Sequence, residues 1–108
     1  MSTAATLVQR ARTAANARGL STERLDCLAL GYGIRTGPWK GELLDLVREA
    51  WGDQRIFVEA SAYSELWSVN SCTRPLRQLA VDAGEVEALI AALEAAPLSL
   101  TEAPEAAP

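Results

Sequence analysis

A glycine-rich and tryptophan-rich segment from residue 31 to residue 52 constrains the fold more than any other part of the chain. It reads GYGIRTGPWKGELLDLVREAWG and holds five of the seven glycines and two of the three tryptophans. Pro38 suits the first turn of a helix, where its missing N–H has no intrahelical partner, and Gly52 suits a helix end. The segment therefore predicts a turn followed by a helix that runs to about Trp51.

The predicted helix carries an apolar arc that is broader than one packed stripe needs. Such an arc means that the helix is nearly central to the core or that part of the arc meets another molecule. The residues on this arc are Trp39, Leu43, Leu44, Leu46, Val47, Ala50 and Trp51.

Two helices are predicted before this segment. Residues 3–18 place apolar side chains at helical spacing, and Gly19 is a natural helix stop. Ser21 or Thr22 then caps a second helix that ends at the first glycines of the segment. The apolar residues of this second helix are Leu25, Leu28, Ala29 and Leu30, with Cys27 at the edge.

The chain after residue 74 predicts two further helical stretches. Pro75 opens the first, PLRQLAV. Asp82 with Glu85 forms a capping box, in which the Asp side chain accepts N–H bonds and the Glu reaches back. The last helix that starts there has a clear i, i+3, i+4, i+7 stripe, formed by Val86, Leu89, Ile90 and Leu93.

The sequence between these helices predicts a β-hairpin. Residues 55–60 (RIFVEA) and 65–70 (ELWSVN) are rich in strand formers and are joined by a short loop. Regular alternation would put Phe57 and Trp67 on one face, opposite the face of Ile56, Val58 and Leu66, which leaves one apolar set for a partner. The competing prediction is a helix capped by Ser61, since residues 62–69 also fit helical spacing.

We therefore expect an α+β domain with four to five short helices and one hairpin over residues 1–96, and an all-α domain if the helical alternative holds. Residues 97–108 are rich in Pro, Ala and Glu and predict a disordered tail. The order of elements resembles the architecture of a winged helix-turn-helix, in which the third helix would enter the DNA major groove.

The charge of the chain does not favour nucleic acid as a partner. The net charge is −4, and the third helix carries Glu42, Asp45 and Glu49, which would repel phosphates.

The charge is also uneven, with four arginines up to Arg24 and six acids from Asp82 onward. We expect the first and last helices to attract each other through these charges.

The chain lacks residues that several kinds of catalytic and metal-binding site require. The chain has no histidine, so it lacks the usual general base and the commonest metal ligand. Cys27 and Cys72 are too few for a zinc site and are expected to be reduced and buried. Gly31, Gly33 and Gly37 are better explained as helix punctuation than as a dinucleotide fingerprint. We expect no catalysis, no cofactor and no metal, and no apolar run is long enough for a membrane helix, so we expect a cytoplasmic protein.

The aromatic residues provide the best functional signal, because all six lie between residues 32 and 67. Trp, Tyr and Arg are enriched at the energetic centres of interfaces. We therefore predict a protein-interaction module, an adaptor or inhibitor of the kind that phages and mobile elements encode. It would bind another protein or a second copy of itself, and the alternative is a DNA-binding regulator of the winged-helix type. The predicted contact residues are Tyr32, Arg35, Trp39, Lys40, Phe57 and Trp67.

Overall fold

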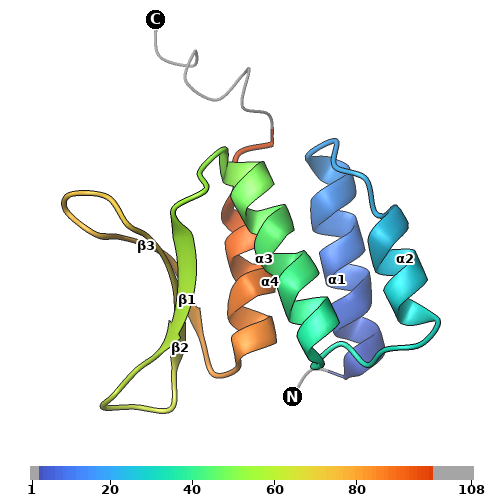
Figure 1. Ribbon diagram of the computed structural model, residues 1–108, viewed down its shortest axis with the longest axis horizontal. Helices are drawn as coiled ribbons and strands as arrows, with labels where there is room; N and C mark the ends of the chain where they lie inside the picture. Colours follow the sequence, from blue (N-terminus) through green and yellow to red (C-terminus); the bar gives the residue numbers. More distant parts are fainter. Residues whose placement is uncertain (1–2, 99–108) are drawn as a thin grey trace, which may run out of the picture.

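The computed structural model describes residues 3–98 and consists of four helices and one three-stranded antiparallel sheet (Figure 1). The prediction of an α+β fold is confirmed, and the all-α alternative is wrong. The predicted tail falls mostly on residues 99–108, which lie outside the described residues. In chain order the elements are α1 (Ala4–Ala17), α2 (Glu23–Ala29), α3 (Gly37–Trp51), β1 (Ile56–Ala60), β2 (Trp67–Ser71), β3 (Arg77–Asp82) and α4 (Glu85–Ala95).

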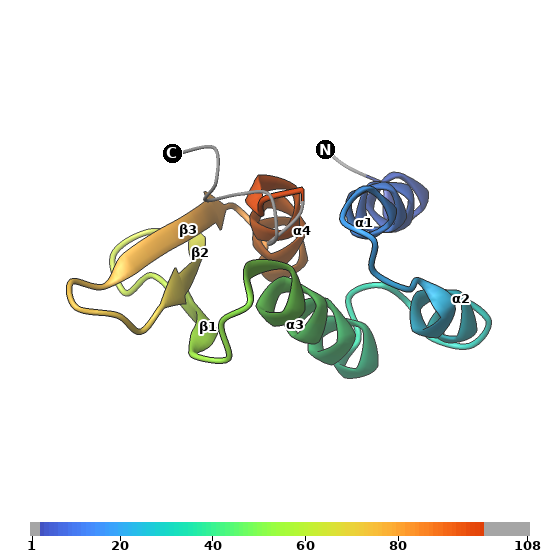
Figure 2. The same ribbon diagram turned by 90° about the horizontal axis from the view of Figure 1, so that it is seen from above.

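Helix α4 lies at the centre of the molecule. It packs against β3 and β2 on one side and against α3 and α1 on the other, while α2 lies outside this centre, packed against α3 and joined to α1 by the ion pair between Arg12 and Asp26 (Figures 1 and 2). The helices α1, α3 and α4 run in the same direction, so their N-terminal ends lie at the same end of the molecule (Figure 1).

The boundaries of α1 and α3 agree with the sequence patterns. Thr3 accepts a hydrogen bond from the Thr6 N–H at the start of α1. Gly19 follows α1 with φ of 72°, and Gly52 ends α3 with φ of 65°. Both values lie in the left-handed region, which glycine adopts without steric cost.

The hairpin is present, with β2 between β1 and β3. Ala60 lies opposite Trp67, so six residues form the connecting loop, and Val58 lies opposite Val69. This register puts Trp67 on the same face as Ile56 and Val58, against the core, while Phe57 lies on the outer face. The prediction that Phe57 and Trp67 share a face is therefore wrong, because the loop pairs odd-numbered residues of β1 with even-numbered residues of β2.

Strand β3 replaces a predicted helix. The PLRQLAV segment pairs with β2, so its backbone hydrogen bonds go to a neighbouring strand and not to its own chain. The predicted capping box is also wrong, since Gly84 occupies the N-cap of α4. Asp82 instead accepts a hydrogen bond from the N–H of Ala83, 2.6 Å away.

The predicted attraction between the first and last helices is confirmed. The guanidinium of Arg10 forms two hydrogen bonds, of 3.0 and 2.6 Å, with the carboxylate of Glu94 in α4. Arg18 donates to the backbone carbonyl oxygens of Glu94 and Ala96 beyond the end of α1. These contacts join α1 to the C-terminal end of α4.

Cys27 and Cys72 are free, and both are exposed, so their predicted burial is wrong. Within residues 3–98, no helix combines the length and the hydropathy that crossing a membrane requires.

Candidate interaction surface

The turn between α2 and α3 exposes two large apolar side chains. Leu30 is 89% exposed and Tyr32 is 54% exposed, whereas Ile34 between Tyr32 and α3 is buried in the core. The turn is thus anchored by Ile34 and holds Leu30 and Tyr32 in solvent. We call Leu30, Tyr32 and Arg35 the turn surface.

Backbone hydrogen bonds fix the shape of this turn. The N–H of Gly31 and the N–H of Tyr32 both donate to the carbonyl oxygen of Leu28, at 3.1 and 2.8 Å. Thr36 donates from its backbone N–H and its hydroxyl to the carbonyl oxygen of Gly33. These hydrogen bonds hold the two ends of the turn, and the exposed side chains project from between them.

Trp39 supports the turn from the core side. Its side chain is fully buried, and its indole N–H donates to the carbonyl oxygen of Tyr32 at 2.8 Å. The prediction that Trp39 contacts a partner directly is therefore corrected: as the largest fully buried side chain it belongs to the core. Its position links the shape of the turn to the packing of α3.

Two ion pairs connect the turn and the start of α3 to the first turn of α4. Arg35 forms hydrogen bonds of 2.9 and 2.5 Å with the carboxylate oxygens of Glu87. Lys40 lies 3.1 Å from the carboxylate of Glu85. The hydrogen bond from Arg35 holds the pKa of Glu87 below its ordinary value. Arg35 keeps 54% of its side chain exposed, so it remains accessible beside Tyr32.

The structure does not bring all predicted contact residues together. Tyr32, Arg35, Trp39 and Lys40 gather where the turn meets α3 and α4. Phe57 and Trp67 lie in the sheet, on opposite faces, with Trp67 packed against the core. The sheet lies on the far side of α4 from α2 (Figure 1).

Leu30 was missed as a surface residue. The sequence assigned it to the apolar side of the second helix, but that helix ends at Ala29 and buries only Leu25 fully. Leu25, Leu28 and Ala29 follow the i, i+3, i+4 spacing of one helix face, whereas Leu30 at i+5 falls outside that spacing, and this was the available signal.

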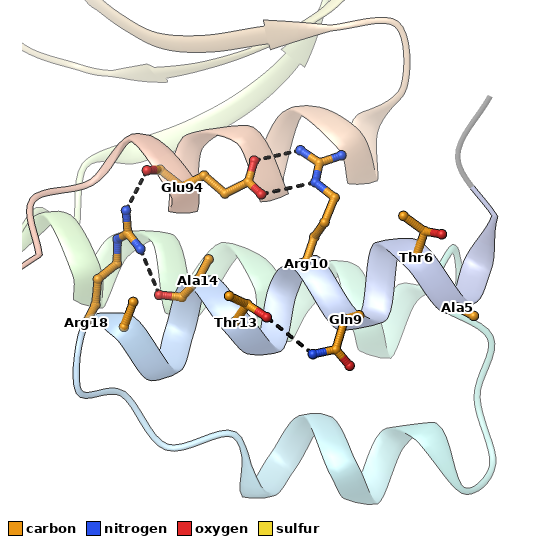
Figure 3. Close-up of a pocket in the computed structure, with 9 residues that line it drawn as sticks. Ala5, Thr6, Gln9, Arg10, Thr13, Ala14, Arg18 and Glu94 are labelled. Carbon is orange, nitrogen blue, oxygen red and sulfur yellow. Dashed lines mark hydrogen bonds and ion pairs between the residues drawn. The ribbon is translucent and has the colours of Figure 1, made fainter.

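A groove of about 670 Å³ lies along α1 and Glu94 of α4 (Figure 3). Its floor includes Ala14 and Ala17. Its polar groups are already paired: Arg10 with Glu94, Gln9 with the hydroxyl of Thr13, and Arg18 with backbone carbonyl oxygens. The groove thus offers a ligand little free hydrogen-bonding capacity.

The open side of α3 is acidic. Glu42, Asp45 and Glu49 line a hollow of about 510 Å³ between α2 and α3, with Arg24 at its edge. Burial raises the pKa of Glu42 above its ordinary value, although Arg24 acts in the opposite direction. This surface would repel phosphate groups.

Residues 3–98 contain no group of three or more acidic or cysteine side chains arranged to hold a metal ion. Comparisons with protein-family models, curated proteins and solved structures give no match to the chain.

Proposed function

We propose that this chain is a non-enzymatic protein-interaction module, an adaptor or inhibitor, that docks on another protein through the turn surface. The observation that carries the proposal is the exposure of Leu30 and Tyr32 on a turn whose backbone is held by hydrogen bonds. Contiguous exposed apolar patches on soluble proteins mark contact sites.

The composition of the turn surface suits the centre of an interface. A Tyr and an Arg beside an aliphatic side chain match the residues that dominate binding energy. The fixed backbone lowers the entropy lost on binding, since the turn does not need to be ordered by the partner. Arg35, half exposed while paired with Glu87, supplies a charge that steers orientation more than affinity.

No specific observation favours the alternative of a winged-helix regulator. In that arrangement α3 would be the recognition helix, and its open side presents Glu42, Asp45 and Glu49. A DNA-binding role would require phosphates and bases to approach three carboxylates.

The test uses a photo-crosslinking amino acid placed at Tyr32 in one variant and at Tyr63 in a second. Tyr63 is 99% exposed but lies in the β1–β2 loop, so it is a matched control. We expect one host protein to crosslink at position 32 and not at position 63. The purified partner should then bind Tyr32→Ser at least about tenfold more weakly than the wild type, as expected for an interface anchor.

Tyr63→Ser should bind that partner as tightly as the wild type. Equal crosslinking at both positions would contradict the proposal. So would unchanged affinity of a folded Leu30→Ser, Tyr32→Ser double variant.

A further inference from the structure

The two edges of the sheet differ in how far they are covered. At the β1 edge, the carbonyl oxygen of Ile56 accepts a hydrogen bond of 3.0 Å from the side chain of Arg48 in α3. At the β3 edge, no hydrogen bond within residues 3–98 reaches the side of the strand that faces away from β2. An open strand edge is a template for pairing with another strand.

The register shows which backbone groups of β3 point outward. The N–H of Ser61 donates to Leu66 and the N–H of Cys72 donates to Arg55, which makes these the hydrogen-bonded pairs of the β1–β2 ladder. Hydrogen-bonded and non-hydrogen-bonded pairs alternate along antiparallel strands. Every second residue of β2 between Leu66 and Cys72 therefore directs its backbone N–H and C=O toward β3. Those residues are Trp67, Val69 and Ser71, and their partners in β3 are Asp82, Ala80 and Arg77.

Gln78 and Val81 are therefore the residues of β3 that direct backbone groups away from the sheet. In a regular strand, outward-directed residues are separated by one residue. Here the register shift inserts Leu79, so two residues separate Gln78 from Val81. A regular partner strand can match only one of them, which disfavours an ordinary extended peptide at this edge.

A second β3 strand has the same irregular spacing. Consider an antiparallel pair in which Gln78 of one copy lies opposite Val81 of the second copy. By the two-fold symmetry, Val81 of the first copy then lies opposite Gln78 of the second copy. The backbone groups of both outward-directed residues are therefore hydrogen-bonded in each copy. The same register sets Arg77 opposite Asp82 of the second copy. Both residues lie on the inner face, since each is paired with an inner-face residue of β2, so opposite charges meet across the new pair.

We propose that the β3 edge binds a second copy of this chain, giving a two-fold symmetric dimer with a continuous six-stranded sheet. The extra residue Leu79 favours a second copy as the partner, because another β3 strand has the same spacing of outward-directed backbone groups and a regular strand does not. The edge is separate from the turn surface, so the dimer presents two turn surfaces.

The test is sedimentation velocity of the full chain over a concentration series from micromolar to millimolar. We expect a reversible monomer–dimer equilibrium. Val81→Pro removes an outward N–H and leaves the β2–β3 ladder intact, since Val81 is not one of the ladder donors. This change removes two hydrogen bonds per dimer and should weaken association at least about tenfold. Ala60→Pro, at an outward position of the β1 edge, is the control and should leave association unchanged.

A charge swap tests the register itself. Arg77→Asp and Asp82→Arg should each weaken the dimer, and the double variant should restore it, with folding of each monomer checked by circular dichroism. A chain that is monomeric at all concentrations would overturn the proposal. Equal effects of Val81→Pro and Ala60→Pro, or failure of the double variant to restore the dimer, would overturn it as well.

Discussion

The helices α4 and α2 lie on either side of α3 and contribute very differently to the core. Helix α4 buries Val86, Ala88, Leu89, Ile90, Ala92 and Leu93. Helix α2 buries Leu25 alone and is followed by the exposed Leu30 and Tyr32. The difference separates a helix that contributes most of its apolar side chains to the core from one that is followed by solvent-exposed apolar side chains.

Leu89→Ala should have the largest effect on stability. Leu89 is 1% exposed and lies in the centre of the core, so its truncation leaves a cavity. We expect the free energy of unfolding to fall by about 2–5 kcal/mol, measured by urea denaturation. Leu30→Ala, measured in parallel, should change the free energy of unfolding far less, because Leu30 is exposed. Similar losses of stability for the two variants would contradict the difference between α4 and α2.

Trp39→Phe should have the next largest effect, because Trp39 links the core to the turn. The change keeps an aromatic ring but leaves the carbonyl oxygen of Tyr32 without its donor. A loss of about 1–3 kcal/mol is expected for a partly buried acceptor left unpaired. Hydrogen exchange of the amides in residues 30–36 should accelerate more than exchange in α4. Unchanged exchange in the turn would show that Trp39 does not position it.

Glu87→Gln and Glu42→Gln should change stability in opposite directions at pH 7. The pKa of Glu87 is lowered in the folded state, so its carboxylate stabilises the fold above an ordinary Glu pKa of about 4.3. Glu87→Gln should lower the free energy of unfolding by about 0.2–1 kcal/mol. This loss should vanish as the pH falls through the lowered pKa of Glu87 in the folded protein.

The pKa of Glu42 is raised by burial, so its carboxylate begins to oppose folding as the pH rises above the ordinary pKa and opposes it fully above the folded pKa. Glu42→Gln should therefore stabilise the protein at pH 7, and the gain should disappear below a pH of about 4.3. Denaturation series at pH 7 and pH 3 test both signs. A destabilised Glu42→Gln at pH 7 would contradict the assignment of burial as the dominant cause.

Leu30→Ser and Tyr32→Ser should have the smallest effect on stability. Both side chains are mainly solvated, so each change should stay within about 0.5 kcal/mol of the wild type. A thermal melt provides the measurement. If either variant unfolds, the turn surface belongs to the core and is not a separate contact site.

The parts of the fold with one regular period could be predicted from the sequence. The stripe of Val86, Leu89, Ile90 and Leu93 predicted α4, and all four residues are buried. Strand β3 could not be predicted in this way. Its register shift places Leu79 and Ala80 against the same core, so Leu76, Leu79 and Ala80 repeat at i, i+3 and i+4 and imitate a helix.

The candidate site could be predicted only in part. Tyr32 and Arg35 were predicted as contact residues, and both are exposed in the structure. Trp39 was placed on the surface because a tryptophan suits either a core or an interface, and composition does not distinguish the two. Its burial depends on α4 and Tyr32, which only the tertiary structure brings to it.

The pairing of α1 with α4 has a consequence for the order in which the chain folds. Arg10 and Arg18 of the first described helix bind groups near the end of the last one. During synthesis the apolar side of α1 remains without α4 until α4, the last element within residues 3–98, has been translated. Contacts between such distant segments form slowly. A chain stopped after β3 would leave Leu7 and Ala11 without much of their packing, and chaperones recognise such exposed apolar surface in incomplete chains.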